Sequence, residues 1–489
     1  MSVLATPGFD LIPSAERVAT STNYITNFDF LNQYLPDTYE KEFERYGNRS
    51  ISAFLRMVGA EMPSNSDLIK WTEQGRLHIK YTDCTSGAAA GSLTALITVN
   101  DNLTPVIAGG GTTTAGTGNI AIKVGQTVMI SANAGATTLW NKGIVQSVNT
   151  PSGVPAPGNP QVFTVAYYEA AGQAFALGAQ CSVFIYGSEF QKASTDANML
   201  ALESDDFIFE NSPIIIRDKY VVSGSDMAQI GWVEITSELG ASGYLWYLKS
   251  ESDTRMRFDD YLETAMIEAV PAEAGSGAAN ILAGANIGNK GSQGVFWVVK
   301  NRGNVFSGAP SSLADFDAII QRLDKQGSIE ENVIFCNREL SFDIDDMLAA
   351  QNSYGVNGTS YGLFDNDEEM ALNLGFKGFR RGYDFYKSDW KYLNDAAMRG
   401  GIHAGEIFGL LVPAGSTSVY DQVLGKNAKR PFLHVRYRAS ETEDRRYKTW
   451  ITGSAGGART SGVDEMNVHF LSERAVCTLG ANNFFLMEA

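Results

Sequence analysis

The sequence has few of the side chains that most often carry chemistry. It contains only four cysteines and four histidines in 489 residues. Cys84, Cys181, Cys336 and Cys477 stand far apart, which excludes the close ligand spacing of a structural zinc site. Four cysteines could pair in an oxidising compartment, but this scattered arrangement favours reduced thiols in the core.

Catalytic motifs are missing as well. No Gly-x-Ser-x-Gly turn occurs, and no His-Glu-x-x-His helix contains the four histidines, which are His78, His403, His434 and His469. We expect these histidines to be structural. The glycine-rich segment 109–118 is not followed by Lys and Ser or Thr, so it is no P-loop. Segment 453–462 has the composition of a flexible loop and lacks the glycine order of a nucleotide-binding turn.

Acidic residues cluster in two places without forming a recognisable site. Asp343, Asp345 and Asp346 lie on a predicted helix, where such residues usually form a solvated face. Residues 365–369 begin like a calcium loop, but the sixth position, which needs Gly for its turn, is Met370. Acidic residues are abundant, yet no pair is singled out for glycoside hydrolysis. The sequence therefore predicts no catalytic, cofactor-binding or metal-ligating residues, and no enzyme.

Basic charge and long apolar runs are also scarce. Lys and Arg number 38 against 55 Asp and Glu, and the formal net charge of −17 disfavours a dedicated nucleic-acid reader. No run of about 18 apolar residues occurs. Residues 1–13 lack the basic and apolar regions of a signal peptide. With 44% hydrophobic and 11% aromatic residues, the chain is expected to fold as a soluble, cytosolic protein of more than one domain.

The most informative positive feature is a shift in composition. Residues 84–190 contain only five charged side chains, which are Asp101, Lys123, Lys142, Glu169 and Glu189. Between turn-rich stretches, short β-like runs recur at 94–99, 120–124, 127–131, 143–148, 162–168 and 181–186. The pattern predicts a small, inserted all-β domain, either a barrel or a sandwich.

Strand-like segments flank this stretch on both sides. Residues 77–81 alternate apolar and polar side chains, and residues 212–222 are rich in β-branched ones. We expect the two segments to pair as one long hairpin that holds the inserted domain. Residues 1–35 show no sustained periodicity and are expected to form an extended arm, with a short helix at 50–58.

A helical pattern follows the hairpin. Apolar residues between Leu245 and Ala269 recur with the helical period, and Pro271 ends the pattern. This predicts a helix over residues 242–269, roughly 40 Å long. Further along, Ser312 and Asp315 resemble a capping box for a helix that ends at Gly327.

The rest of the chain alternates between helices and strands. A strand at 333–336 and a helix at 342–350 are expected, followed by strands at 407–412, 432–438, 447–451, 466–471 and 476–479. The succession of a long helix, an α/β unit and several strands predicts an α+β fold.

This order of blocks resembles the major capsid protein fold of tailed bacteriophages, which encapsulin shells share. Residues 332–337 look like the family's strand–Asn–helix passage, residues 407–413 like its late axial strand, and residues 449–470 like its terminal strand pair. The additional β structure is similar to that of capsid proteins from crAss-like phages.

The resemblance implies five domain-level parts. They are an N-terminal arm and short helix (1–60), an E-loop (61–83 and 191–235), the inserted β domain (84–190), a peripheral domain with its spine helix (236–310 and 439–489) and an axial domain (311–438). Within the E-loop, residues 76–81 would pair with residues 212–222.

The resemblance also implies the function and the partners. Such a chain self-assembles into hexamers and pentamers of an icosahedral shell that encloses double-stranded DNA, and its other partners are scaffolding, portal and decoration proteins. It needs no cofactor, binds no membrane, and belongs to the virion, which is assembled in the cytoplasm of the bacterial host. The charge-poor β domain is expected on the outer surface, in contact with accessory proteins or host glycans.

Three alternatives stay open at this point. The first is another virion protein, such as a portal or tail component. The second is an encapsulin-type compartment shell. The third is a carbohydrate-active enzyme with a β-sandwich module.

Overall fold

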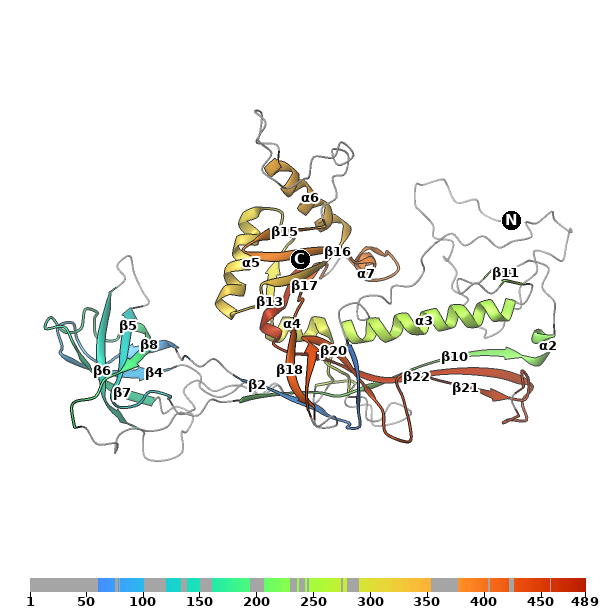
Figure 1. Cartoon of the computed structure of the whole chain (residues 1–489), viewed down its shortest axis with the longest axis horizontal. Helices are drawn as coiled ribbons and strands as arrows, with labels where there is room; N and C mark the ends of the chain where they lie inside the picture. Colours follow the sequence, from blue (N-terminus) through green and yellow to red (C-terminus); the bar gives the residue numbers. More distant parts are fainter. Residues whose placement is uncertain are drawn as a thin grey trace. The chain divides into compact units, whose positions relative to one another are not determined.

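The computed structural model describes residues 60–74, 78, 80–100, 120–132, 139–149, 161–193, 206–228, 235–236, 242–243, 246–273, 276–278, 290–352, 377–402, 405–421, 426–457 and 459–489. The chain divides into a barrel unit, Lys70–Glu210, and a main unit, Met1–Ile69 with Asn211–Ala489. Both helices and strands are present (Figure 1), which confirms the mixed class expected from the sequence. The expected arm at 1–35, helix at 50–58 and acidic segment 365–369 lie outside the described residues.

Six strands of the barrel unit close on themselves in the order β3-β4-β7-β6-β5-β8. They are β3 (Lys80–Ser86), β4 (Thr94–Val99), β5 (Gln126–Ala132), β6 (Trp140–Asn149), β7 (Gln161–Tyr167) and β8 (Gln180–Ser188). Side chains that alternate along these strands fill the interior, and Ile97, Ile130, Phe163 and Val183 are completely buried. Five of the six expected strands here are confirmed, whereas residues 120–123 of the expected strand at 120–124 form none.

A buried glutamine ties the barrel interior together. Gln173 accepts hydrogen bonds from the hydroxyls of Ser86 (2.8 Å) and Tyr167 (3.0 Å), and its amide donates to the carbonyls of Ala88 and Phe175. Both ends of this side chain are therefore satisfied, which removes the cost of burying it.

The pairing expected for the flanking hairpin is wrong. Lys80 and Tyr81 pair with β8 of the barrel, and residues 214–223 pair with a strand near the C-terminus. The segments that pair with each other are β2 (Ile69–Gln74) and β9 (Asp206–Asn211). Lys70 forms an ion pair with Glu210 across these two strands (3.2 Å). Alternation alone located the strands but not their partners.

In the main unit, a five-stranded sheet has the order β1-β20-β22-β10, with β21 also paired to β22. Its strands are β1 (Ala60–Ser64), β10 (Ile214–Ser223), β20 (Leu433–Arg438), β21 (Lys448–Gly453) and β22 (Glu465–Thr478). The strands expected separately at 466–471 and 476–479 form one continuous strand, β22. This length lets β22 pair with β10 and β21 near its start and with β20 near its end.

A second sheet of the main unit has six strands in the order β13-β23-β17-β14-β16-β15. They are β13 (Asn304–Ser307), β14 (Glu331–Cys336), β15 (Gly378–Arg381), β16 (Tyr383–Asp389), β17 (Ile407–Pro413) and β23 (Phe485–Glu488). Ile334 and Cys336 of β14 pack with α5 (Leu313–Gln326) and α6 (Arg338–Asn352), whereas Phe335 packs with α4 (Val295–Arg302) on the other face. Helices thus cover both faces of this sheet.

The predicted caps of α5 are confirmed. Ser312 and Asp315 form the reciprocal capping box, and Gly327 adopts the left-handed conformation (φ 67°) that ends the helix. The long helix α3 (Trp246–Glu268) lies within the expected range but begins later, because residues 242–243 belong to a short strand.

The remaining elements are short. They are the strand pairs β11 (Ile235–Thr236) with β12 (Ser242–Gly243) and β18 (Ser416–Asp421) with β19 (Lys426–Pro431), the helices α2 (Gly224–Met227) and α7 (Lys391–Asn394), and the 3-10 turns η4 (Arg399–Gly401) and η5 (Ala481–Asn483).

Candidate functional site

The most distinctive feature of the main unit is a long strand ladder backed by a helix. Strands β10 and β22 pair in register from Ile214 opposite Arg474 to Ser223 opposite Glu465, and α3 lies along one face of this ladder (Figure 1). Phe258 of α3 is completely buried against Phe470 of β22. Burial of apolar side chains between helix and ladder therefore makes one stiff, extended element.

An ion pair strengthens the same contact. The guanidinium of Arg257 on α3 donates from Nε (3.3 Å) and Nη2 (3.2 Å) to a carboxylate oxygen of Asp218 on β10. Because Arg257 is half exposed, this pair contributes little stability, and the apolar cluster around Phe258 holds the helix on the ladder.

Strand β10 stands at the edge of its sheet. Within the described part of the chain, no strand pairs with its outer side. The backbone N–H of Lys219 donates to the side chain of Asp218 (2.8 Å), so this N–H points away from β22. A ten-residue strand with an unpaired edge is a template for strand addition by another chain.

The face of this sheet opposite α3 is cationic. Arg217 and Lys219 are exposed there, and neither has an ion-pair partner among the described residues. Lys219 is paired in register with His469, which is in turn paired with Trp450 of β21. Burial, together with the charges of Lys219 and Arg217, lowers the pKa of His469.

His469 is held in a defined orientation. Its ring stacks on that of Trp450, with centroids 4.9 Å apart and planes 13° apart. The Thr452 hydroxyl lies 2.8 Å from its Nε2 atom. The expected structural role of this histidine fits these contacts. Trp450, His469 and Lys219 thus form a row across three strands. Such a row can bind an acidic group of a partner protein.

Ion pairs join β1, β20 and β22 next to the ladder. Glu473, whose side chain is 8% exposed, pairs with Arg438 (3.4 Å) and Arg445 (2.8 Å). Glu61 of β1 pairs with Arg446 and with the buried Arg474 (3.3 Å). The Arg474 guanidinium also donates to the Arg446 carbonyl (3.0 Å). The buried charges of Glu473 and Arg474 are therefore both matched, which such burial requires.

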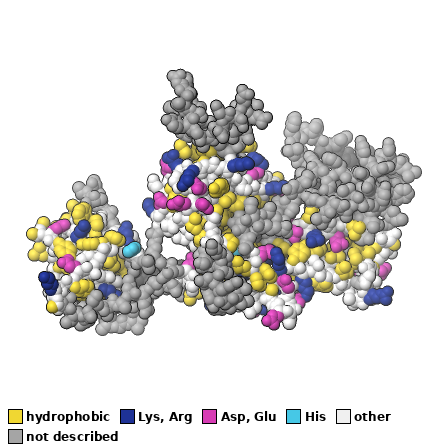
Figure 2. Space-filling view, in the orientation of Figure 1, with side chains coloured by type: hydrophobic (Ala, Val, Ile, Leu, Met, Phe, Trp, Pro, Cys, Tyr) yellow, Lys and Arg dark blue, Asp and Glu magenta, His cyan; other side chains and the backbone are white. Residues whose placement is uncertain are grey.

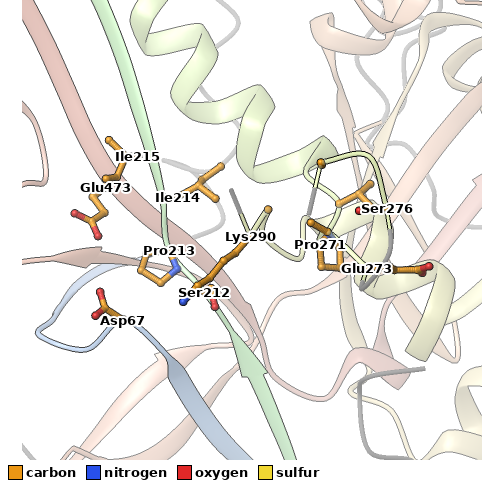
Figure 3. A pocket seen from close by; sticks show the side chains of 14 residues that line it. Asp67, Ser212, Pro213, Ile214, Ile215, Pro271, Glu273, Ser276, Lys290 and Glu473 are labelled. Carbon is orange, nitrogen blue, oxygen red and sulfur yellow. The ribbon is translucent and has the colours of Figure 1, made fainter. Parts of the chain in front are cut away.

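A cavity of about 820 Å³ lies near the start of β10. Ser212, Pro213 and Ile214 line one part of it, and Pro271 and the residues after it line another (Figure 3). Of its acidic residues, Asp67 and Glu473 both pair with the guanidinium of Arg438, whereas the carboxylate of Glu273 lies apart from theirs (Figure 3). The two neighbouring carboxylates are thus bound in ion pairs.

Most of the other residues that the sequence singled out lie at separate locations. All four cysteines are buried and unbridged, as predicted, and Cys84 of β3 stands opposite Cys181 of β8. His78 is exposed and does not lie in a strand, whereas His434 is buried, and His403 and segment 109–118 lie outside the described residues. Asp343, Asp345 and Asp346 lie on α6 as expected, and Asp345 pairs with Lys387.

Two further observations concern only the described residues. No three His, Cys, Asp or Glu side chains are arranged there to hold a metal ion. Of the helices in this part of the chain, none is long and apolar enough to span a membrane.

No protein-family model and no curated protein matches the chain. Solved chains that are similar to this one include chains from phages and capsids. A chain from Microbacterium phage Oxtober96 is 9% identical, with a TM-score of 0.37 over 94% of this chain and 97% of that one. A chain from the capsid of a native GTA particle is 9% identical, with a TM-score of 0.33 over 96% and 99%. One from the mature capsid of bacteriophage PhiM1 is 11% identical, with a TM-score of 0.29 over 62% and 79%.

Scores below 0.5 at such identities do not establish a shared fold. The functional interpretation therefore depends on the ladder, its helix and its exposed edge. Sequence reasoning missed the cationic face, because Arg217 and His469 are 252 positions apart and only the β10–β22 register brings them together. The alternation of polar and apolar side chains over residues 465–471 could have shown that His469 lies on the polar face of its strand.

Proposed function

We propose that the chain is a structural shell subunit, the major capsid protein of a tailed bacteriophage. In this proposal it assembles into hexamers and pentamers of an icosahedral shell around double-stranded DNA, and it is not an enzyme. The observation that carries the proposal is the edge of β10, which is unpaired among the described residues along a ladder stiffened by α3. Such an edge is a liability in a monomer and is covered when a neighbour binds.

The charge distribution supports association between copies of this chain. The chain carries a formal net charge of −17, yet Arg217 and Lys219 present unpaired positive charge beside the exposed edge. A cationic patch on one copy and acidic surface on the next favour a head-to-tail contact, which closes into rings when the rotation between copies allows. The exposed edge of β10 and the positive charge beside it together favour assembly with copies of this chain over binding of a small substrate.

The finer parts of the proposal follow the same arrangement. We assign α3 as the spine helix, and we place the E-loop at 61–83 and 191–235, ranges that contain β2 and β9. The inserted β domain (84–190), the axial domain (311–438) and the type found in crAss-like phages belong to the proposal too. Scaffolding, portal and decoration proteins would be its partners in the virion.

Negative-stain electron microscopy of the purified full chain tests this function. Rings of six or five subunits, or closed shells, are the expected particles. Rings of twelve would favour a portal instead, and monomers at all concentrations would contradict a shell subunit.

A further inference from the structure

The outer wall of the barrel carries an aromatic platform, which we define as Trp140, Phe184 and Tyr186 with Lys142. The three rings are 49%, 41% and 46% exposed. They lie on β6 and β8, which are both neighbours of β5 in the barrel. Hydrophobic side chains reach the surface of the barrel unit in Figure 2. The rings therefore stand on either side of β5, and contiguous exposed apolar patches of this kind mark interaction sites.

The strand register gives the platform its shape. Met129 of β5 is paired with Lys142 on one side and Phe184 on the other, so these three side chains form a row on the outer face. The Lys142 ammonium lies 5.7 Å from the ring centroid of Trp140 and 5.5 Å from that of Tyr186. Because β6 and β8 are two strand spacings apart, roughly 10 Å, the ammonium lies between the two rings.

Lys142 has no acidic partner to neutralise it. It is the only charged side chain in the sequences of β5, β6 and β8. No carboxylate of the described chain forms an ion pair with it. Glu189, which follows β8, instead accepts a hydrogen bond from Tyr168 (2.5 Å). The platform therefore combines two aromatic walls with one unmatched positive charge.

These features discriminate between classes of ligand. Three half-exposed rings offer roughly 300 Å² of surface, well below the roughly 800 Å² that one side of a standard protein interface buries. A nucleic-acid groove needs several cations along its length to follow the phosphates, and this face has two, Lys142 on β6 and the exposed Lys80, which stands opposite Phe184 on β3. Aromatic rings that stack on the apolar faces of sugars, beside a cation, suit a carbohydrate that bears a negative charge.

We propose that the platform binds an acidic oligosaccharide. Its sugar rings stack on Trp140 and Tyr186, and its carboxylate or sulfate accepts hydrogen bonds from the Lys142 ammonium between them. A ligand that contacts both rings is expected to span at least two sugar units. This inference goes beyond the proposed shell function and holds for an unassembled chain as well.

Isothermal titration calorimetry on the full chain with tetragalacturonic acid tests the proposal. Saturable binding is expected, with an affinity that falls roughly tenfold or more in Trp140→Ala and in Lys142→Gln, since each loses one main contact. The matched control is Leu93→Ala, which removes a 59% exposed side chain outside the three platform strands and should bind like the wild type. Circular dichroism checks that each variant keeps its fold.

Two further ligands complete the test. The methyl-esterified tetramer keeps the sugar rings but loses the charge, and it should bind roughly tenfold more weakly. Equal affinity for the ester would overturn the acidic class. Absence of binding at millimolar sugar, an unchanged affinity in Trp140→Ala, or displacement of the sugar by oligodeoxythymidylate would overturn the proposal itself.

Discussion

The ring of Phe258 in α3 lies 5.7 Å from the ring of Phe470 in β22, measured between centroids. Tyr447 approaches the same ring edge-on at 5.4 Å. Val222 and Met466 complete this cluster, so both strands of the ladder contact the helix. The helix and the ladder are consequently one packed element, and the exposed edge of β10 has a stiff backing.

Truncation of this contact should destabilise the main unit. Phe258→Ala is expected to lower the free energy of unfolding by about 3–5 kcal/mol, because it leaves a cavity under a completely buried ring. Tyr261→Ala, which changes a 46% exposed residue of the same helix, should cost less than about 1 kcal/mol. Urea unfolding followed by fluorescence measures both, and equal losses would show that α3 is not anchored through Phe258.

The edge of β10 can be blocked without disturbing its ladder. The N–H of Lys219 points away from β22, so Lys219→Pro removes an outward donor and keeps the pairing with β22. We expect this variant to fold but not to assemble. Lys219→Gln removes only the charge and should still assemble, although more slowly at low salt. Light scattering after size exclusion compares the two, and normal assembly of the proline variant would rule out strand addition at this edge.

Several elements were predictable because a local signal determines them. The residues Ser312, Asp315 and Gly327 predict the caps of α5. The alternation of side chains predicts the strand Thr94–Val99 with the bounds that the structure shows. Both depend on neighbours in sequence, through a capping hydrogen bond in one case and side-chain alternation in the other.

The strand partners were not predictable in the same way. Residues 214–223 have the composition of a strand whichever chain segment lies beside them, and only the folded structure selects Glu465–Arg474 over residues 76–81. The cationic face and the aromatic platform depend on such long-range pairing, so neither could be found from spacing. The sequence also did not show that β22 is one strand. Its polar residues Ser472, Glu473 and Arg474 interrupt the apolar pattern, although they are buried in the folded chain.

Stability should depend on pH through His469. Its pKa in the folded chain is lowered from 6.5, so the unfolded chain binds a proton more readily. Its contribution to stability is therefore complete above about pH 6.5 and is lost as the pH falls through the folded pKa. His469→Gln should flatten this dependence, whereas His78→Gln, at an exposed site, should leave it unchanged. Urea midpoints between pH 5 and 7.5 measure the slope, and an unaltered slope in His469→Gln would contradict this role.

The ion pairs of Glu473 give a further test. Glu473→Gln removes the carboxylate that Arg438 and Arg445 share and should destabilise the main unit by about 2 kcal/mol, because Arg445 loses this partner whereas Arg438 keeps Asp67. Glu443→Gln breaks the pair with Lys448, whose side chains are both about half exposed, and should have no measurable effect. Chemical denaturation of the two variants decides, and similar midpoints for both would mean that burial of Glu473 does not matter.

The cysteines should be unreactive in the folded chain. All four are buried, and burial raises the pKa of Cys181 to about 11 and that of Cys336 to about 12. Ellman's reagent at pH 8 should label the native protein slowly and all four thiols promptly in guanidinium. Rapid labelling of native protein would show that these cores open readily.

The most direct measurement is a cryo-electron microscopy map of the particle that the full chain forms. We expect backbone density from a second copy roughly 4.8 Å from Ile214–Ser223, on the side to which the Lys219 N–H points. An assembled particle in which this edge of β10 faces solvent, or a chain that stays monomeric, would contradict the account.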